Sequence, residues 1–194
     1  MDSSIKLGKV LGIPIRLHFT WFIIFALVTV SLSLQYFPVQ YPHWSKVLSW
    51  VIGISTSLLF FASVIAHELS HSLVSAHNGI PVKSITLFIF GGVARISKEA
   101  DKAWSEFKMA IAGPLSSLLI GGFFGLIWLL TRHNSQPVAA LSVWLFRINI
   151  LLAAFNLIPG FPLDGGRVFR AILWRWTGNM KKATRIASWV GQGV

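Results

Sequence analysis

Long apolar stretches alternate with short polar or basic connections along most of the chain. A helix needs about 20 residues to cross a hydrocarbon core of roughly 30 Å. The pattern therefore predicts four membrane-spanning helices, over residues 17–36, 47 to about 78, 109–130 and 138–158. A fifth apolar stretch begins near Ile186 and is cut off at Val194, so we expect a further span to continue beyond the given sequence.

The segment between the second and third predicted spans, "IPVKSITLFIFGGVARIS", follows a different pattern. It is rich in Ile, Val, Thr and Phe and partly alternates, which predicts a short hairpin that turns at Gly91 and Gly92. Its middle, residues 85–93, is too apolar for water and too short to cross a membrane, so we expect a re-entrant hairpin buried against the helices. The predicted fold is one unit over residues 1–194, a polytopic α-helical membrane bundle with a short β-hairpin or small sheet near its cytoplasmic side.

Composition and charge support a membrane protein and give it an orientation. The chain is 54% hydrophobic and 12% charged, about half the charged fraction of an ordinary soluble domain. Of 17 Lys and Arg residues, 14 precede the first span, follow the second or follow the fourth, whereas the other two connections carry only Lys46 and Arg132. The positive-inside rule then predicts a cytoplasmic N-terminus in a cell membrane. Because the net charge of +11 is explained by this topology, nucleic acid is not an expected partner.

Small residues recur every four positions in two predicted spans, at Gly113, Ser117, Gly121 and Gly125 in the third and at Ser49, Gly53 and Ser57 in the second. This spacing lets helix backbones approach closely. Chance abundance of small residues in membrane helices is the alternative.

Ionisable residues in the second span carry the candidate chemistry. His67 and His71 are four residues apart, so on a helix their rings converge on one face. With Glu68 they form H-E-x-x-H, in which both histidines bind zinc and the glutamate is the general base. Hydrogen-bonded structural histidines are the alternative. If the helix ends at Asn78, Glu68 lies about 15 Å inside the membrane from that end.

A hydrolytic zinc site takes three protein ligands and leaves a position for water. The absence of cysteine excludes thiolate ligands. Of six acidic residues, four lie in the terminus or in the cytoplasmic loop between the second and third spans, where we assign Glu106. Asp164 is then the candidate third ligand, in a Gly- and Pro-rich segment that follows the fourth span. The alternative role for Asp164 is to cap the helix that begins there.

The stretches "HELSH", "FGGVARI", "AGPLSS" and "FNLIPGFPLDGGRVFRAIL", in this order, resemble the site-2 protease family of intramembrane zinc metalloproteases. The resemblance covers nearly the whole chain and is strongest to a prokaryotic branch in which CBS domains follow six spans. It implies one zinc ion held by His67, His71 and Asp164, with Glu68 as the base. It also implies that Asn156 binds substrate or the intermediate, and that the hairpin at Gly91 and Gly92 corresponds to a substrate-binding re-entrant loop.

These observations predict a metalloprotease that cuts peptide bonds within transmembrane segments, in regulated intramembrane proteolysis. The resemblance implies single-span membrane proteins as substrates, and it leaves a homo-oligomer open. A metal transporter and a peptidase that acts on soluble or prenylated ends at the membrane face are the alternatives. A transporter has no need of Glu68 beside His67, and the predicted depth of Glu68 disfavours the peptidase.

Overall fold

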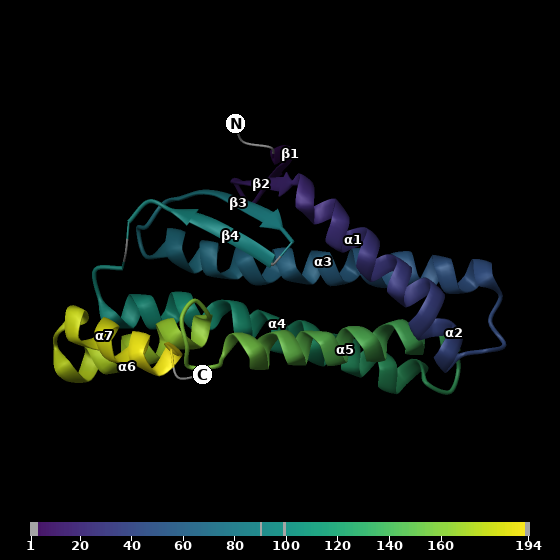
Figure 1. The fold of residues 1–194 in the computed structure, drawn as a ribbon. Helices are drawn as coiled ribbons and strands as arrows, with labels where there is room; N and C mark the ends of the chain where they lie inside the picture. Colours follow the sequence, from purple (N-terminus) through teal and green to yellow (C-terminus); the bar gives the residue numbers. More distant parts are fainter. Residues whose placement is uncertain (1–3, 90, 99, 193–194) are drawn as a thin grey trace.

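Four apolar helical segments form the body of the molecule, which is known from a computed structural model that describes residues 4–89, 91–98 and 100–192. Each segment is long and apolar enough to cross a membrane. In Figure 1, α3 lies between α4 and α5 on one side and the sheet on the other. The first segment comprises α1 (Phe19–Ser31), a π-helical turn η1 (Leu32–Tyr36) and α2 (Phe37–Gln40); the others are α3 (Lys46–His77), α4 (Ala103–Thr131) and α5 (Gln136–Asn156).

The ends of α3 follow from local chemistry. Ser45 caps its first turn, because the Ser45 hydroxyl accepts a hydrogen bond from the backbone N–H of Leu48 at 3.1 Å. At the other end Asn78 is the C-cap, and Gly79 takes the positive φ of +75° that turns the chain away. The predicted end of the second span is therefore confirmed. By contrast α4 begins at Ala103 and not at Met109, because the polar side chains of its first turns obscured the apolar pattern.

A four-stranded sheet, in the order β1-β2-β3-β4, lies against one end of α3 (Figure 1). Its inner strands, β2 and β3, pair in parallel, and each outer strand is antiparallel to its neighbour. The predicted turn at Gly91 and Gly92 is wrong, because Gly91 pairs with Phe88 and Gly92 with Leu87 inside the second strand of the hairpin. The N-terminal pair of strands was not predicted. The strands are β1 (Ser4–Val10), β2 (Ile13–His18), β3 (Val82–Phe88) and β4 (Gly91–Ile96).

The sheet attaches to α3 through alternate apolar residues. Along β2, every second side chain from Ile13 to Leu17 is buried, as expected for a strand with one face on a core. These side chains pack with β3 against Val64, Ile65 and Leu69 of α3. The hairpin β3–β4 is thereby fixed beside the turn of α3 that carries the H-E-x-x-H sequence.

Two further helices, α6 (Asp164–Thr177) and α7 (Met180–Gln192), follow α5 and lie at the same end of the bundle as the sheet (Figure 1). The first turn of α6 packs closely on the preceding segment: a methyl group at Gly166 would come within 2.7 Å of the carbonyl carbon of Gly160. Within the described residues, α7 already begins at Met180 and is not among the helices long and apolar enough to span a membrane. The expectation that a further span begins near Ile186 and continues beyond the given sequence stays a prediction.

Candidate metal centre and catalytic residues

Three side chains from two elements converge on one point inside the bundle. His67 and His71 lie on successive turns of α3 and are only 3% and 6% exposed. Asp164 is the first residue of α6, and its Oδ2 lies 3.2 Å from Nε2 of His67 and 3.0 Å from Nε2 of His71. The two Nε2 atoms are 3.2 Å apart. Within the described part of the chain, this trio is the group of His, Asp and Glu residues close enough to share a metal ion.

Helix α4 fixes the orientation of both rings through their other nitrogens. The Nδ1 of His71 lies 2.6 Å from the carbonyl oxygen of Met109, and the Nδ1 of His67 lies 2.9 Å from the hydroxyl of Ser117. A carbonyl oxygen only accepts, so Nδ1 of His71 carries the proton and its Nε2 presents a lone pair. Such a hydrogen bond to the second nitrogen is what sets the ligating nitrogen of a metal-bound histidine.

The donor atoms of this trio fit a divalent cation. A lone pair on Nε2 of His71 faces the carboxylate oxygen of Asp164 at 3.0 Å, an arrangement that repels unless a cation or a proton lies between them. A tetrahedral zinc site with bonds of 2.0–2.1 Å separates its ligand atoms by about 3.3 Å, close to the separations seen here. Two imidazole nitrogens and one carboxylate oxygen are donors that zinc takes, and the carboxylate must be ionised to bind the metal.

Gly113 of α4 gives the two rings their space. A methyl group there would overlap Nε2 of His71 and come within 2.6 Å of Nε2 of His67. The small residues of α4 therefore serve two purposes. Gly113 makes room for the histidine rings, whereas Gly121 and Gly125 allow close packing against Ile150 and Phe146 of α5.

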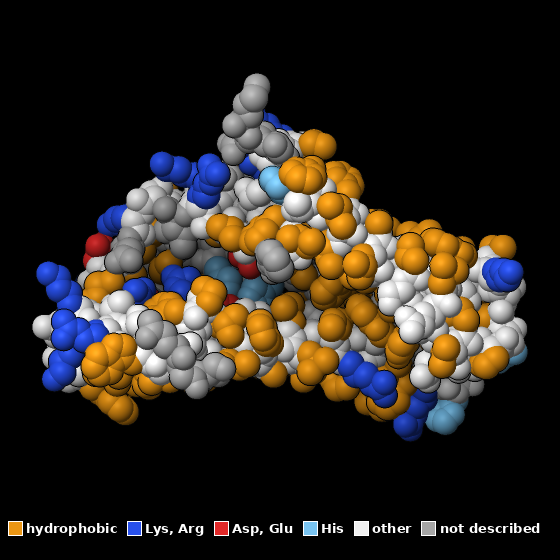
Figure 2. Space-filling model, in the orientation of Figure 1, with side chains coloured by type: hydrophobic (Ala, Val, Ile, Leu, Met, Phe, Trp, Pro, Cys, Tyr) orange, Lys and Arg blue, Asp and Glu red, His pale blue; other side chains and the backbone are white. Residues whose placement is uncertain are grey.

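Glu68 lies next to the trio, on the side of α3 that faces the hairpin. Its carboxyl group is packed against the backbone of β4: a methyl group at Gly92 would come within 2.8 Å of Cδ of Glu68. The side chain is partly buried. Figure 2 shows this face of the molecule hollowed between the sheet and the helices at the opposite edge, with histidine and acidic side chains at its floor. A base at this position is within reach of both solvent and the metal ligands.

The remaining candidates occupy different surroundings. Gly91 lines an apolar cavity of about 310 Å³ between α1, α3 and the hairpin, together with Trp21, Phe61 and Leu87. The amide of Asn156, at the last residue of α5, donates to the carbonyl of Leu152 at 2.9 Å within its own helix. The N-cap position of α6 belongs to Leu163, so the carboxylate of Asp164 turns to the histidines and does not cap the helix.

Sequence reasoning missed the residues of α4 that support the site. The sequence assigns Gly113 and Ser117 only to close helix packing, and it gives neither residue a role at the metal site. Glu106, which we assigned to a loop, is a buried residue of α4. The spacing of Glu106, Met109, Gly113 and Ser117 by three, four and four residues was the available signal, because it places all four on one helix face.

Comparisons with known proteins agree with this geometry. The model of peptidase family M50 matches residues 55–134 and 125–193. The Synechocystis sp. protein sll0528, whose name assigns it provisionally to the zinc metalloproteases, is 47% identical over all of this chain and 50% of its own length. Zinc metalloprotease MJ0392 of Methanocaldococcus jannaschii is 37% identical over all of this chain and 52% of its own.

The chain therefore spans about half the length of these curated relatives. The solved structure of a site-2 protease from Methanocaldococcus jannaschii superposes with a TM-score of 0.60 at 34% identity, covering 95% of this chain and 77% of that one. The helical bundle with its small sheet is the fold of that protease. The chain is a multi-pass membrane protein that belongs to peptidase family M50.

Proposed function

We propose that the chain is the catalytic part of a zinc metalloprotease that hydrolyses peptide bonds within transmembrane segments of membrane proteins. The observation that carries the proposal is the convergence of His67, His71 and Asp164 beside Glu68, inside a bundle of four apolar helical segments. The proposed setting is a cell membrane with the N-terminus in the cytoplasm, supported by the uneven distribution of Lys and Arg. One zinc ion per chain is the proposed cofactor.

In this proposal the chain's own groups divide the work of hydrolysis. His67, His71 and Asp164 would hold a zinc ion, which would supply the Lewis acidity that acidifies a water molecule and polarises the scissile carbonyl. The carboxylate of Glu68 accepts the proton of the attacking water and passes it to the leaving amine. Asn156 is proposed to hold the substrate. In this role its side-chain amide would release the carbonyl of Leu152 and donate its hydrogen bond to the substrate instead.

Strand β4 is the proposed binding element for substrate. It lies at the edge of the sheet, and its Gly92 contacts Glu68. A transmembrane helix hides its peptide bonds in its own hydrogen bonds, so it must unwind before cleavage. An unwound segment that pairs with β4 would present its backbone next to Glu68, in the strand-addition mode of peptide recognition. Single-span membrane proteins are the proposed substrate class, and the apolar cavity beside Gly91 would receive their side chains.

Substitution Glu68→Gln tests the proposal. The variant keeps the three metal ligands and loses the proton acceptor, so it should bind zinc as the wild type does and cleave at least about 100-fold more slowly. Zinc content by mass spectrometry and cleavage of a single-span substrate in proteoliposomes measure the two effects. His67→Ala is the companion variant, which should lose both zinc and cleavage. Cleavage by Glu68→Gln near the wild-type rate would refute the role of Glu68, and zinc flux without proteolysis would favour a transporter.

A further inference from the structure

Glu106 is the feature that the proposed chemistry does not use. Its side chain is only 1% exposed, in the first turn of α4. Its Oε1 accepts a hydrogen bond from Nε of Arg170 at 2.9 Å and a second, shorter one from Nη2 of the same side chain. Nε of Arg167 lies 4.0 Å from the same oxygen. Both arginines belong to α6, so Glu106 ties α4 to the helix that begins with Asp164.

The ion pair also reaches the segment that leads into Asp164. The guanidinium of Arg170 lies 5.5 Å from the centre of the Phe161 ring, within the range of a cation–π contact. Arg170 is six residues after Asp164, or about 9 Å along the helix axis. Arg170 therefore holds both α6 and the turn before it in place relative to α4.

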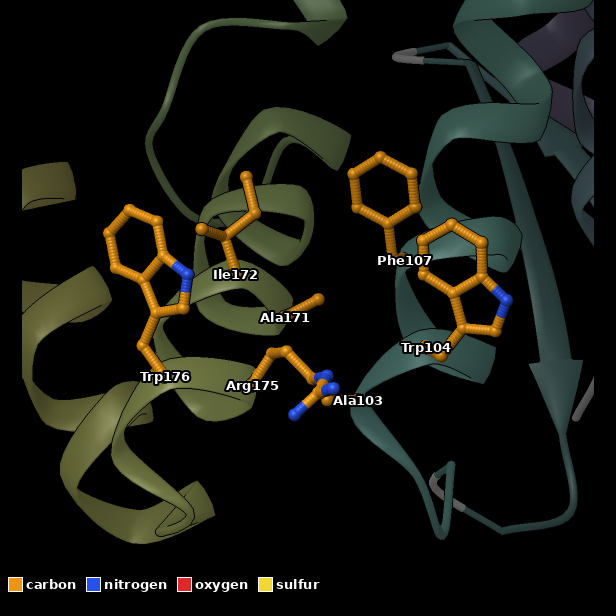
Figure 3. Close-up of a pocket in the computed structure, with 7 residues that line it drawn as sticks. All are labelled: Ala103, Trp104, Phe107, Ala171, Ile172, Arg175 and Trp176. Carbon is orange, nitrogen blue, oxygen red and sulfur yellow. The ribbon is translucent and has the colours of Figure 1, made fainter.

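A pocket of about 150 Å³ lies between α4 and α6, and Figure 3 shows Phe107 of α4 and Ala171 of α6 beside it. Trp104, Ile172 and Trp176 also line this pocket. A second cavity, of about 430 Å³, is lined by Glu106, Arg167 and Arg170 themselves. The ion pair is a directional contact between α4 and α6, and it acts together with the close packing of Gly166 on Gly160 to set the position of α6.

We propose that Glu106, through Arg170, is a positioning residue that keeps the carboxylate of Asp164 close to the Nε2 atoms of His67 and His71. The inference rests on the proposed metal site and deepens it. The same face of α4 then orients all three ligands: Ser117 and Met109 set the two imidazoles, and Glu106 sets the helix that carries the carboxylate. Removing one partner leaves a buried charge without its counter-ion, so α6 moves to rehydrate it.

Cobalt(II) binding to the detergent-purified chain tests the proposal, because the visible spectrum of cobalt reports the number and kind of its ligands independently of activity. Glu106→Gln should weaken cobalt affinity by about 10- to 100-fold and alter the spectrum. The matched control is Asp101→Asn, which removes an acid from an exposed ion pair with Lys98 nearby. The control should bind cobalt with the affinity and spectrum of the wild type.

A double-mutant cycle separates positioning from general damage. If Glu106 acts through Arg170, the losses of cobalt affinity in Glu106→Gln and Arg170→Gln should not add, and the double variant, which leaves no unpaired buried charge, should bind cobalt no more weakly than either single variant. Additive losses, or an unchanged spectrum in Glu106→Gln, would overturn the inference. Should Glu106→Gln not fold, Arg170→Lys keeps the charge, loses the two-pronged contact and should alter the spectrum in the same sense. A wild-type chain that binds no cobalt or zinc would refute the proposed function itself.

Discussion

At the scale of single residues, the site depends on groups that bind no metal. Ser117 is buried, and its hydroxyl contacts Nδ1 of His67 at 2.9 Å, so it sets which nitrogen of that ring faces the trio. We expect Ser117→Ala to lower zinc affinity by about 10-fold or more with little change in stability. Ser116→Ala is the matched control, since its hydroxyl donates to the carbonyl of Gly113 in its own helix. Competition with a chelator measures both, and equal affinities would argue against an orienting role for Ser117.

Gly113 offers a steric test of the same arrangement. In Gly113→Ala the new methyl group would overlap the ring of His71, so the rings must move and metal binding should be lost. The overpacking should also cost about 1–3 kcal/mol of stability. Gly122→Ala in the same helix meets no atom within 4 Å and should stabilise α4 by about 0.5–1 kcal/mol. Zinc content and thermal unfolding in detergent compare the two, and zinc retained in Gly113→Ala would contradict the geometry.

The sequence revealed the candidate metal ligands and the candidate base, but not the residues that orient them. His67, Glu68 and His71 were found because charged or polar groups are costly within an apolar span. The hydrogen bond to Met109 could not be found in this way, because it uses a backbone carbonyl that every residue possesses. Glu106 precedes the apolar run that begins at Met109, so the pattern assigned it to a loop. Its ion pair could not be predicted either, because Arg170 is 64 residues away and only folding brings the two charges together.

At the scale of elements, hydropathy located the four spans because length and apolar content are local properties. The helical bundle and small sheet are confirmed. Strands β1 and β2 were missed because β1 is exposed along most of its length and carries Lys and Gly. The hairpin was found, yet its turn was placed at Gly91 and Gly92 on composition alone. Glycine is needed at position 92 for another reason: the side chain of Glu68 packs against the strand in the space that a side chain at this position would occupy.

Strand β4 gives the element-scale prediction. If substrate pairs with the open edge of β4, a photo-crosslinking residue at Val93, whose side chain is 48% exposed, should capture a single-span substrate in proteoliposomes. The other edge of the same sheet is β1, where Leu7 is 60% exposed and provides the matched position. Crosslinks should form at position 93 and not at position 7. Equal capture at both positions would mean that β4 is not the binding edge.

At the scale of the whole molecule, the polar features gather at one end of the bundle. The sheet, α6 and α7 all lie there, whereas the connections on the far side of the spans are short (Figure 1). Fourteen of the 17 Lys and Arg residues also belong to this end. The hollow between the sheet and the helices in Figure 2 lies toward the same end, which supports the proposal that water enters the site from that side of the membrane.

The proposed orientation can be tested directly, because the chain has no cysteine and single cysteine variants label without background. Asn134→Cys lies in the exposed connection between α4 and α5, and Ser97→Cys lies in the exposed segment between β4 and α4. With a membrane-impermeant maleimide, position 134 should react in intact cells and position 97 only after permeabilisation. The opposite result would place the N-terminus and the mouth of the hollow outside the cell. Water and substrate tails would then reach Glu68 from the exterior, and the excess of basic residues at that end would need another explanation than topology.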